Sequence, residues 1–336
     1  MSSSTSNSEH WRFLGWVLAA LVASGLVVNA IPWGGVPGMQ RGHERIGKEL
    51  GPRTDFLIVG DSKAGPFSVN CLSPWLPGKR GLTFSADSVT PVFHYDTLRE
   101  IHEAEPGFAP PVVFVFLGAN NLNANGLHVE RDYTFFNELG LADAWALSAP
   151  QGEVLSFAAA LLSRLFPVYG KRVMITHLQF RELKNSCEGA SDPEFDRARW
   201  APSPPARRKP VLDRNYLDIY RRSMYADYRS SPIVVAATGR VLEGVQQWGG
   251  VPVIVLPPVT PEMRALEHEL IGEAFDDTVN QLAREHGVAV LDLRERADYD
   301  FADVNHLTPA AARLASEEHL YPRVVETLAK RASPGS

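Results

Sequence analysis

Five short segments consist almost entirely of apolar residues, and they limit what the chain can fold into. Residues 56–59 form one continuous run, FLIV, and similar runs recur at residues 111–118, 251–258 and 287–293. A weaker run occupies residues 81–85. A strand without polar alternation is expected where both of its faces are buried, as in a parallel sheet covered by helices. The sequence therefore predicts the strands of a central, mostly parallel sheet.

Stretches with helical periodicity separate these strands. They cover residues 92–104, 232–248 and 261–286, and a last helix is expected from Thr308 to about residue 330. Thr308 is suited to cap that helix, and Pro309 to occupy its first turn. Strands that alternate with helices predict an α/β fold, here a three-layer α/β/α sandwich around the sheet.

The first part of the chain has a different composition. Residues 1–12 are polar and are predicted to be disordered, whereas residues 13–31 carry no charged side chain. As a helix, residues 13–31 would be about 28 Å long, which matches the hydrocarbon core of a bilayer. Trp11 and Trp33 flank the run, as interface anchors often do. We predict a single transmembrane helix at residues 13–31.

Two questions about this segment stay open in the sequence. Residues 28–30, VNA, resemble a signal-peptide cleavage site, but the weak basic region before the run favours an uncleaved anchor. The orientation is not decided by charge, since Arg12 precedes the run while Arg41, Arg45 and Lys48 follow it. Taken alone, that small bias would leave the body of the protein in the cytoplasm.

The body is expected at residues 54–332, after a linker at residues 32–53 that is rich in glycine and proline. Residues 120–230 depart from the alternation of strands and helices, and we predict one long insertion there, serving as a lid or a docking surface. The two cysteines, Cys71 and Cys187, leave a disulfide between them open. The formal net charge of -6 excludes nucleic acid as an expected partner, because phosphate binding needs a basic surface.

Polar clusters follow three of the predicted strands. Ser62 lies in VGDSKAG after the first strand, and Asn120 and Asn121 lie in LGANNLN after the third. Asp303 and His306 lie in DVNHL, between the last strand and the final helix. Each cluster alone is ordinary turn chemistry. Because ligands of an open α/β sheet bind beyond the carboxyl ends of its strands, the three clusters together point to a catalytic site.

In these clusters the chain resembles the SGNH (GDSL-type) hydrolase superfamily. Gly60-Asp61-Ser62 is similar to the first sequence block of that family, Gly118-Ala119-Asn120 to the third, and the segment DVNHLT at residues 303–308 to the last. The resemblance covers roughly residues 54–330, with the insertion unmatched. It implies the flavodoxin-like fold of that superfamily.

The resemblance also implies roles for individual residues. Ser62 would be the nucleophile that forms an acyl intermediate, His306 the base that accepts its proton, and Asp303 the group that orients the imidazole. Asn120 would donate its side-chain amide to the oxyanion, together with the backbone N–H of Ser62. Gly118 opens the third block and is counted with this oxyanion site.

The second block of the family is matched poorly. Its glycine normally lends a backbone N–H to the oxyanion hole two positions before a threonine or serine, and here Ser88 precedes Thr90 in that way. Ser88 is therefore the expected backbone donor. No further histidine or cysteine stands at a convincing ligand spacing from Asp303 and His306, so no metal and no cofactor are expected.

One transmembrane span before such a domain resembles the bacterial cell-surface acylation proteins, which work beside a multispanning membrane acyltransferase. That architecture implies an anchored, extracytoplasmic serine esterase or O-acyltransferase that handles acetyl or other short acyl esters of a surface glycan. Two alternatives stay open. One is an anchored lipolytic esterase or thioesterase that acts on small or lipid esters. The other is a non-catalytic glycan-binding or scaffold protein that keeps the fold.

Overall fold

The computed structural model describes residues 12, 15–17, 19–20, 23, 54–67, 79, 81–85, 89–124, 139–165, 210–296 and 298–332. The linker, Cys71, Cys187, Ser88 and most of residues 13–31 lie outside these ranges. Within the described ranges, no helix is both long enough and apolar enough to cross a membrane. The transmembrane helix at residues 13–31 stays a prediction.

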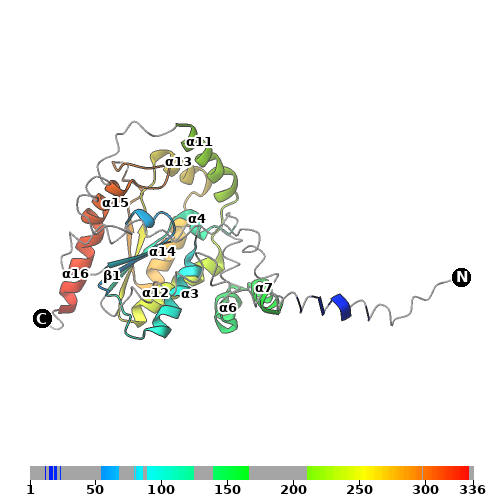
Figure 1. Ribbon diagram of the computed structural model, residues 1–336. Helices are drawn as coiled ribbons and strands as arrows, with labels where there is room; N and C mark the ends of the chain where they lie inside the picture. Colours follow the sequence, from blue (N-terminus) through cyan, green and yellow to red (C-terminus); the bar gives the residue numbers. More distant parts are fainter. Residues whose placement is uncertain are drawn as a thin grey trace.

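A sheet of five parallel strands forms the centre of the protein (Figure 1). The strands are β1 (Phe56–Gly60), β2 (Gly81–Ser85), β3 (Val112–Phe116), β4 (Val251–Leu256) and β5 (Ala289–Asp292). They correspond to the five apolar runs, so the predicted α/β fold with a parallel sheet is confirmed. The strand order is β2-β1-β3-β4-β5. Between β1 and β3 the direction of winding reverses, which is where ligands of open parallel sheets bind.

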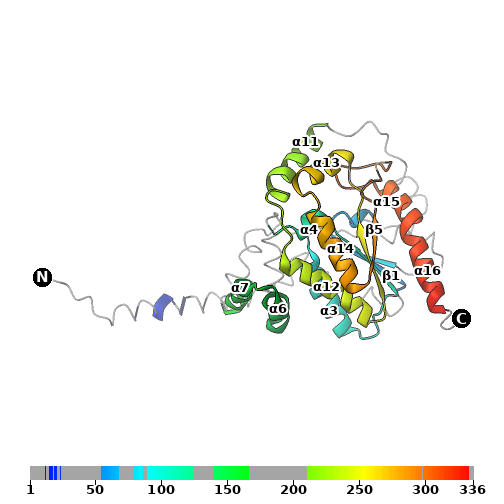
Figure 2. The ribbon, with the colours of Figure 1, turned by 180° about the vertical axis from the view of Figure 1, so that it is seen from behind.

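Helices cover both faces of the sheet, as Figures 1 and 2 show. One face carries α3 (Pro91–Ala104), α12 (Pro232–Gln247) and α14 (Ala274–His286), and the other carries α15 (Pro309–Ala315) and α16 (Tyr321–Ala332). The side chains of β1 divide accordingly. Leu57 and Val59 pack in one apolar cluster, while Phe56 and Ile58 pack in the other. Burial on both faces explains why the strand sequences show no polar alternation.

The predicted single helix at residues 261–286 is wrong. It is two helices, α13 (Pro261–Leu270) and α14, separated by a turn at Gly272 with a φ of 58°. A positive φ of this kind is favourable for glycine and costly for other residues, so the chain breaks there. α14 ends in the same way, at Gly287 with a φ of 62°.

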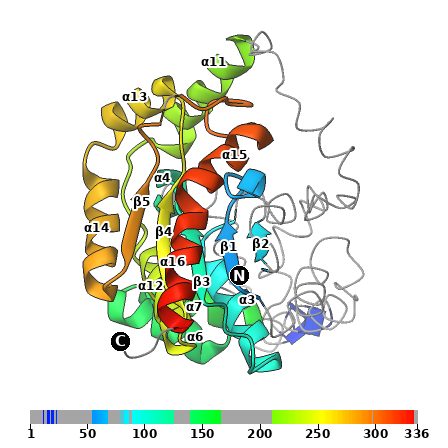
Figure 3. The ribbon, with the colours of Figure 1, turned by 90° about the vertical axis from the view of Figure 1, so that its left-hand side faces the viewer.

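The final helix begins as expected, with the Thr308 hydroxyl accepting a hydrogen bond from the backbone N–H of Ala311. It continues from α15 through a π-helical turn, η7 (Ser316–Leu320), into α16, which runs along the sheet in Figure 3. Between β3 and α12 lie α4 (Ala119–Leu122), α6 (Leu141–Ser148), the 3₁₀ turn η4 (Ala149–Gln151), α7 (Val154–Leu165), α11 (Pro210–Ile219) and the π-helical turn η6 (Tyr220–Met224). A further 3₁₀ turn, η2 (Gly65–Phe67), follows β1.

A buried histidine in α3 makes the stability of this fold depend on pH. His94 packs edge-on against Phe84 with ring centroids 5.4 Å apart, and its burial lowers its pKa from 6.5 to about 4, although the Asp61 carboxylate acts in the opposite direction. Between pH 6.5 and pH 4 the unfolded chain therefore binds a proton that the folded chain does not. We expect this group to remove up to about 3 kcal/mol of stability as the pH falls through that window.

Urea unfolding at pH 7 and pH 4.5 measures this effect. The variant His94→Leu is expected to lose less stability between the two pH values than the wild type, since it lacks the titrating group. His268→Leu, at an exposed position on α13, is the matched control and should behave as the wild type. An equal pH dependence of the His94→Leu variant and the wild type would contradict the prediction.

Candidate active site

The turn after β1 and the loop before α15 bring Ser62, His306 and Asp303 into hydrogen-bond contact. The Ser62 Oγ lies 2.8 Å from Nε2 of His306. On the far side of the ring, Nδ1 of His306 lies 2.7 Å from Oδ2 of Asp303 and 2.9 Å from Oδ1. The structure thus places in one chain of contacts the three residues for which the sequence predicted a nucleophile, a base and an orienting carboxylate.

The charge of Asp303 determines which ring nitrogen of His306 carries the hydrogen. Burial would raise the pKa of its carboxyl, but the hydrogen bond and the charge of His306, with two backbone N–H groups, hold it below its ordinary value of 3.8. An ionised carboxylate only accepts hydrogen bonds. Nδ1 of His306 must therefore carry a hydrogen and donate it to Asp303, which leaves Nε2 able to accept the Ser62 hydroxyl proton.

Local backbone contacts fix the loop that carries the base. Asp303 Oδ1 accepts the backbone N–H groups of Asn305 and His306 at 3.0 and 2.9 Å. Phe301 and Leu307 form an antiparallel bridge across the loop. The carbonyl of Val304 accepts a hydrogen bond from the Thr260 N–H at 3.0 Å, which ties the loop to the start of α13. The backbone that carries the imidazole is therefore fixed by contacts on both sides of His306.

The side chains of Ser62, His306 and Asp303 are only partly covered. His306 is 27% exposed and Asp303 is 18% exposed, and Ser62 has intermediate exposure. The two residues beside Ser62 in the sequence are instead deeply buried, Asp61 at 3% and Lys63 at 4%. The turn thus directs the serine toward His306 while its neighbours point into the protein.

Asn120 lies in the first turn of α4, directly after β3, and is also buried. Its side-chain Oδ1 accepts a hydrogen bond from the Lys63 ammonium, and its Nδ2 lies 3.5 Å from Oδ2 of Asp61. The predicted oxyanion residue is thus in contact with both sequence neighbours of the predicted nucleophile. The predicted backbone donor, Ser88, lies outside the described residues.

Gly118, which the sequence grouped with the oxyanion residues, lies beside the contact between Lys63 and Asn120. Its backbone N–H donates to Oδ1 of Asn121 at 2.8 Å, so that hydrogen is engaged within the turn. A Cβ atom at position 118 would lie 2.5 Å from Nζ of Lys63 and 2.9 Å from Oδ1 of Asn120. Gly118 therefore contributes space for the contact between those two side chains.

Asn121 and Asp61 complete the polar layer beneath the turn. Asn121 Nδ2 donates to Oδ2 of Asp61 at 2.9 Å, and the Lys63 ammonium lies 2.9 Å from the same oxygen. Burial alone would raise the pKa of Asp61, but the charge and hydrogen bonds of Lys63 and the bond from Asn121 hold it well below its usual range. Asp61 is therefore a buried carboxylate that is fully paired.

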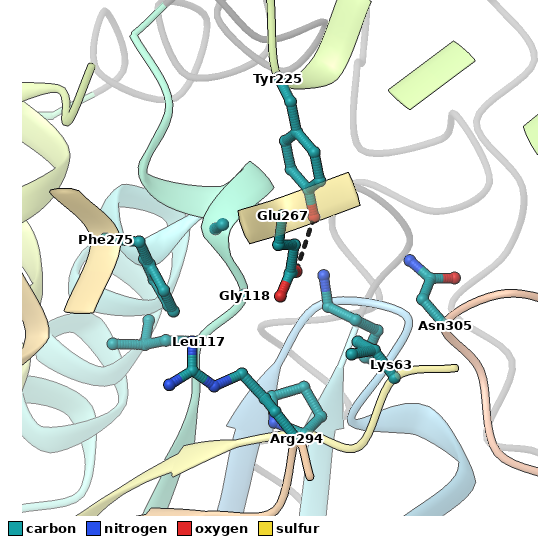
Figure 4. Close-up of a pocket in the computed structure, with 11 residues that line it drawn as sticks. Lys63, Leu117, Gly118, Tyr225, Glu267, Phe275, Arg294 and Asn305 are labelled. Atoms are coloured by element: carbon teal, nitrogen blue, oxygen red, sulfur yellow. Dashed lines mark hydrogen bonds between the residues drawn. The ribbon is translucent and has the colours of Figure 1, made fainter. Parts of the chain in front are cut away.

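A small chamber with polar and apolar walls adjoins Lys63, and Figure 4 shows its lining residues. It has room for about one water molecule. Glu267 of α13 projects into it and accepts a hydrogen bond from the Tyr225 hydroxyl at 3.0 Å. Burial raises the pKa of Glu267 against that hydrogen bond and against the charges of neighbouring basic groups, among them Arg294 and Lys63. A buried acid with a raised pKa in a cleft is a feature that functional sites often have.

Little in the sequence marks Lys63 and Glu267 as site residues. Lys63 follows Ser62 directly, but a lysine after a turn serine is usually solvated. Glu267 lies on α13, where its spacing resembles that of any helix residue. Among the described residues, no three histidine, cysteine or acidic side chains gather as metal ligands would.

Comparisons with known proteins add no assignment to this geometry. The chain matches no protein-family model, and no curated protein matches its sequence.

Proposed function

We propose that this protein is a serine ester hydrolase or O-acyltransferase of the SGNH type. The observation that carries the proposal is the unbroken chain of contacts from Ser62 Oγ through the His306 ring to the Asp303 carboxylate. The strand order β2-β1-β3-β4-β5 supports it, because this is the order of flavodoxin-like folds. The position of Ser62 and Asn120 at the ends of β1 and β3, on either side of the switch point, supports it as well.

The first half of the reaction is transfer of the acyl group to the enzyme. His306 Nε2 accepts the hydroxyl proton of Ser62 while Oγ attacks the ester carbonyl carbon. The carbonyl oxygen takes up the negative charge, which Asn120 and the backbone N–H of Ser62 stabilise. The C–O bond of the ester then breaks, and the proton on Nε2 passes to the departing alcohol. An acyl-Ser62 ester remains.

The second half uses the same groups in the reverse direction. A water molecule or an alcohol gives its proton to His306 Nε2 and attacks the acyl carbon, and the bond to Ser62 Oγ breaks as the proton returns to it. Water as acceptor gives hydrolysis, and a sugar hydroxyl gives O-acylation. Asp303 stays ionised throughout and stabilises the imidazolium that forms in each half.

The proposed setting follows from the apolar segment at residues 13–31. With that segment as an uncleaved anchor, and with the orientation that the resemblance to cell-surface acylation proteins implies, the body would face the outside of the cytoplasmic membrane. Its substrates would be acetyl or other short acyl esters of a surface glycan. A multispanning membrane acyltransferase is the corresponding donor partner. Incubating the protein with a labelled acetyl ester, with and without an oligosaccharide acceptor, separates transfer from hydrolysis, since only transfer leaves the label on the sugar.

Covalent labelling of the full chain tests the proposed chemistry. A fluorophosphonate probe is expected to label the wild type at one serine, because the activated Oγ attacks phosphorus as it would a carbonyl carbon. Ser62→Ala should abolish labelling and His306→Ala should slow it strongly. Ser230→Ala is a suitable control, since that hydroxyl lies 2.8 Å from the hydroxyl of Thr278, away from the His306 ring. An unlabelled wild type, or equal labelling of Ser62→Ala, would refute the proposal.

A further inference from the structure

An ion pair is buried on the two sides of the Ser62 turn, and its presence calls for an explanation. Asp61 and Lys63 are almost fully covered, and Nζ of Lys63 lies 2.9 Å from Oδ2 of Asp61. Removing two charges from water is costly, and a buried pair seldom adds net stability over apolar residues of the same shape. The pair is therefore weak evidence for a stabilising role and better evidence for a positional one.

The same ammonium determines which way the Asn120 amide faces. Lys63 Nζ donates to Oδ1 of Asn120. An ammonium has donors and no acceptor, so a flipped amide would set its NH₂ group against the Lys63 charge. The carbonyl end of Asn120 must therefore face Lys63. Its Nδ2 end lies 3.5 Å from Oδ2 of Asp61, and this carboxylate, which only accepts hydrogen bonds, favours the same orientation of the amide. A cation on the carbonyl oxygen also polarises the amide and strengthens its N–H donors.

Two neighbouring features fit this contact. Gly118 leaves the space in which Lys63 and Asn120 meet, since any side chain there would collide with both. On its other side, the Lys63 ammonium points toward the Glu267 carboxyl across the chamber, as Figure 4 shows. Lys63 is thus held between Asp61, Asn120 and the chamber, with little freedom to move.

We propose that Lys63 is a positioning residue, whose buried ammonium locks the Asn120 amide in the orientation that donates Nδ2 to the oxyanion. The inference rests on the proposed function and assigns to this chain a residue that acts through Asn120 without touching the substrate. Lys63 is the link between the nucleophile turn after β1 and the oxyanion residue after β3. Its loss should therefore affect the transition state more than the binding of the ester.

Kinetics of Lys63→Met on a soluble p-nitrophenyl ester provide the test. The methionine keeps the length of the side chain and removes its charge. We expect kcat to fall by about 100- to 1,000-fold, the effect of losing one oxyanion donor, with KM nearly unchanged. Asn120→Ala should show a similar loss. The double variant should be no slower than the slower single variant, because both changes remove one interaction. Losses that multiply in the double variant would overturn the inference.

A second variant separates position from folding. Lys63→Met alone leaves the buried Asp61 carboxylate without its ionic partner, which is strongly destabilising, whereas Asp61→Asn with Lys63→Met removes both charges. This paired variant, Asp61→Asn with Lys63→Met, should recover much of the thermal stability that Lys63→Met loses. Its kcat should stay low. Recovery of wild-type kcat in the paired variant would sink the inference. Lys79→Met is the matched control, because that lysine is 42% exposed and lies 3.8 Å from Oδ1 of Asp55.

The labelling of Ser62 distinguishes failure of this inference from failure of the proposed function. If the fluorophosphonate labels the wild type and the stable paired variant still turns over ester at the wild-type rate, Lys63 has no positioning role and the serine mechanism stands. If the wild type is not labelled, the serine mechanism itself fails and the inference falls with it.

Discussion

Ser62→Ala is expected to lower kcat for ester turnover by about 10⁴- to 10⁶-fold, the loss found when a triad nucleophile is removed. The Ser62 Oγ is 2.8 Å from His306 Nε2, so its hydroxyl proton can pass directly to this base. The oxyanion donors and the binding site remain in the variant. A small residual rate over the uncatalysed reaction is therefore expected, from water attacking the bound ester directly.

Measuring His306→Ala and the double variant Ser62→Ala/His306→Ala in the same way tests whether the two residues act together. Serine and histidine act as a unit, since the hydroxyl is a poor nucleophile without the base and the base has no proton to accept without the hydroxyl. Each single variant should therefore be as slow as the double variant. Progress curves with p-nitrophenyl acetate at equal protein concentrations measure all three. His268→Ala, at an exposed position on α13, should keep the wild-type rate. If the two single losses multiply in the double variant, the residues do not form one catalytic unit.

Much of the fold was predictable because burial leaves a simple trace in the sequence. The side chains of β1 and β3 are covered on both faces, and the corresponding sequences, FLIVG and VVFVF, are apolar without interruption. The end of each such strand then located the polar turns. Ser62 and Asn120 could be placed at one edge of the sheet in this way, because parallel strands present all their carboxyl ends at the same edge.

The break between α13 and α14 shows where this reasoning fails. Apolar residues continue at helical spacing through the break, with Leu266 and Ile271 before it and Phe275 after it all buried. Periodicity alone therefore predicted one helix. The residue that separates the two helices is Gly272, whose positive φ interrupts the helical path. A single glycine within a periodic segment is compatible with either outcome until the backbone is known.

The contacts among the buried polar residues near Ser62 could not be predicted from the sequence, for a different reason. Lys63 and Asn120 are 57 residues apart, and Tyr225 and Glu267 are 42 apart. Each of these residues has an ordinary explanation in its own segment, as a turn lysine or a helix glutamate. Their role depends on burial and on partners from other strands, which no local pattern records. Pairing of this kind becomes visible only when the fold brings the segments together.

Asp303→Asn is expected to lower kcat by about 10⁴-fold at neutral pH while leaving the fold intact. The backbone contacts of this residue give the reason. Oδ1 of Asp303 accepts the N–H groups of Asn305 and His306, so an asparagine must place its carbonyl oxygen there. Its NH₂ group then takes the place of Oδ2, which lies 2.7 Å from His306 Nδ1.

That NH₂ group is a donor, so the imidazole has to present an unprotonated Nδ1 and carry its hydrogen on Nε2 instead. In this tautomer His306 cannot accept the Ser62 proton, although all three side chains remain in place. Thermal unfolding should therefore change little while ester turnover collapses, and the fluorophosphonate should label the variant far more slowly than the wild type. Asp300→Asn is the matched control, since that aspartate lies exposed in the same loop. A wild-type rate in Asp303→Asn would show that the carboxylate does not set the tautomer, and the base would then have to be sought elsewhere.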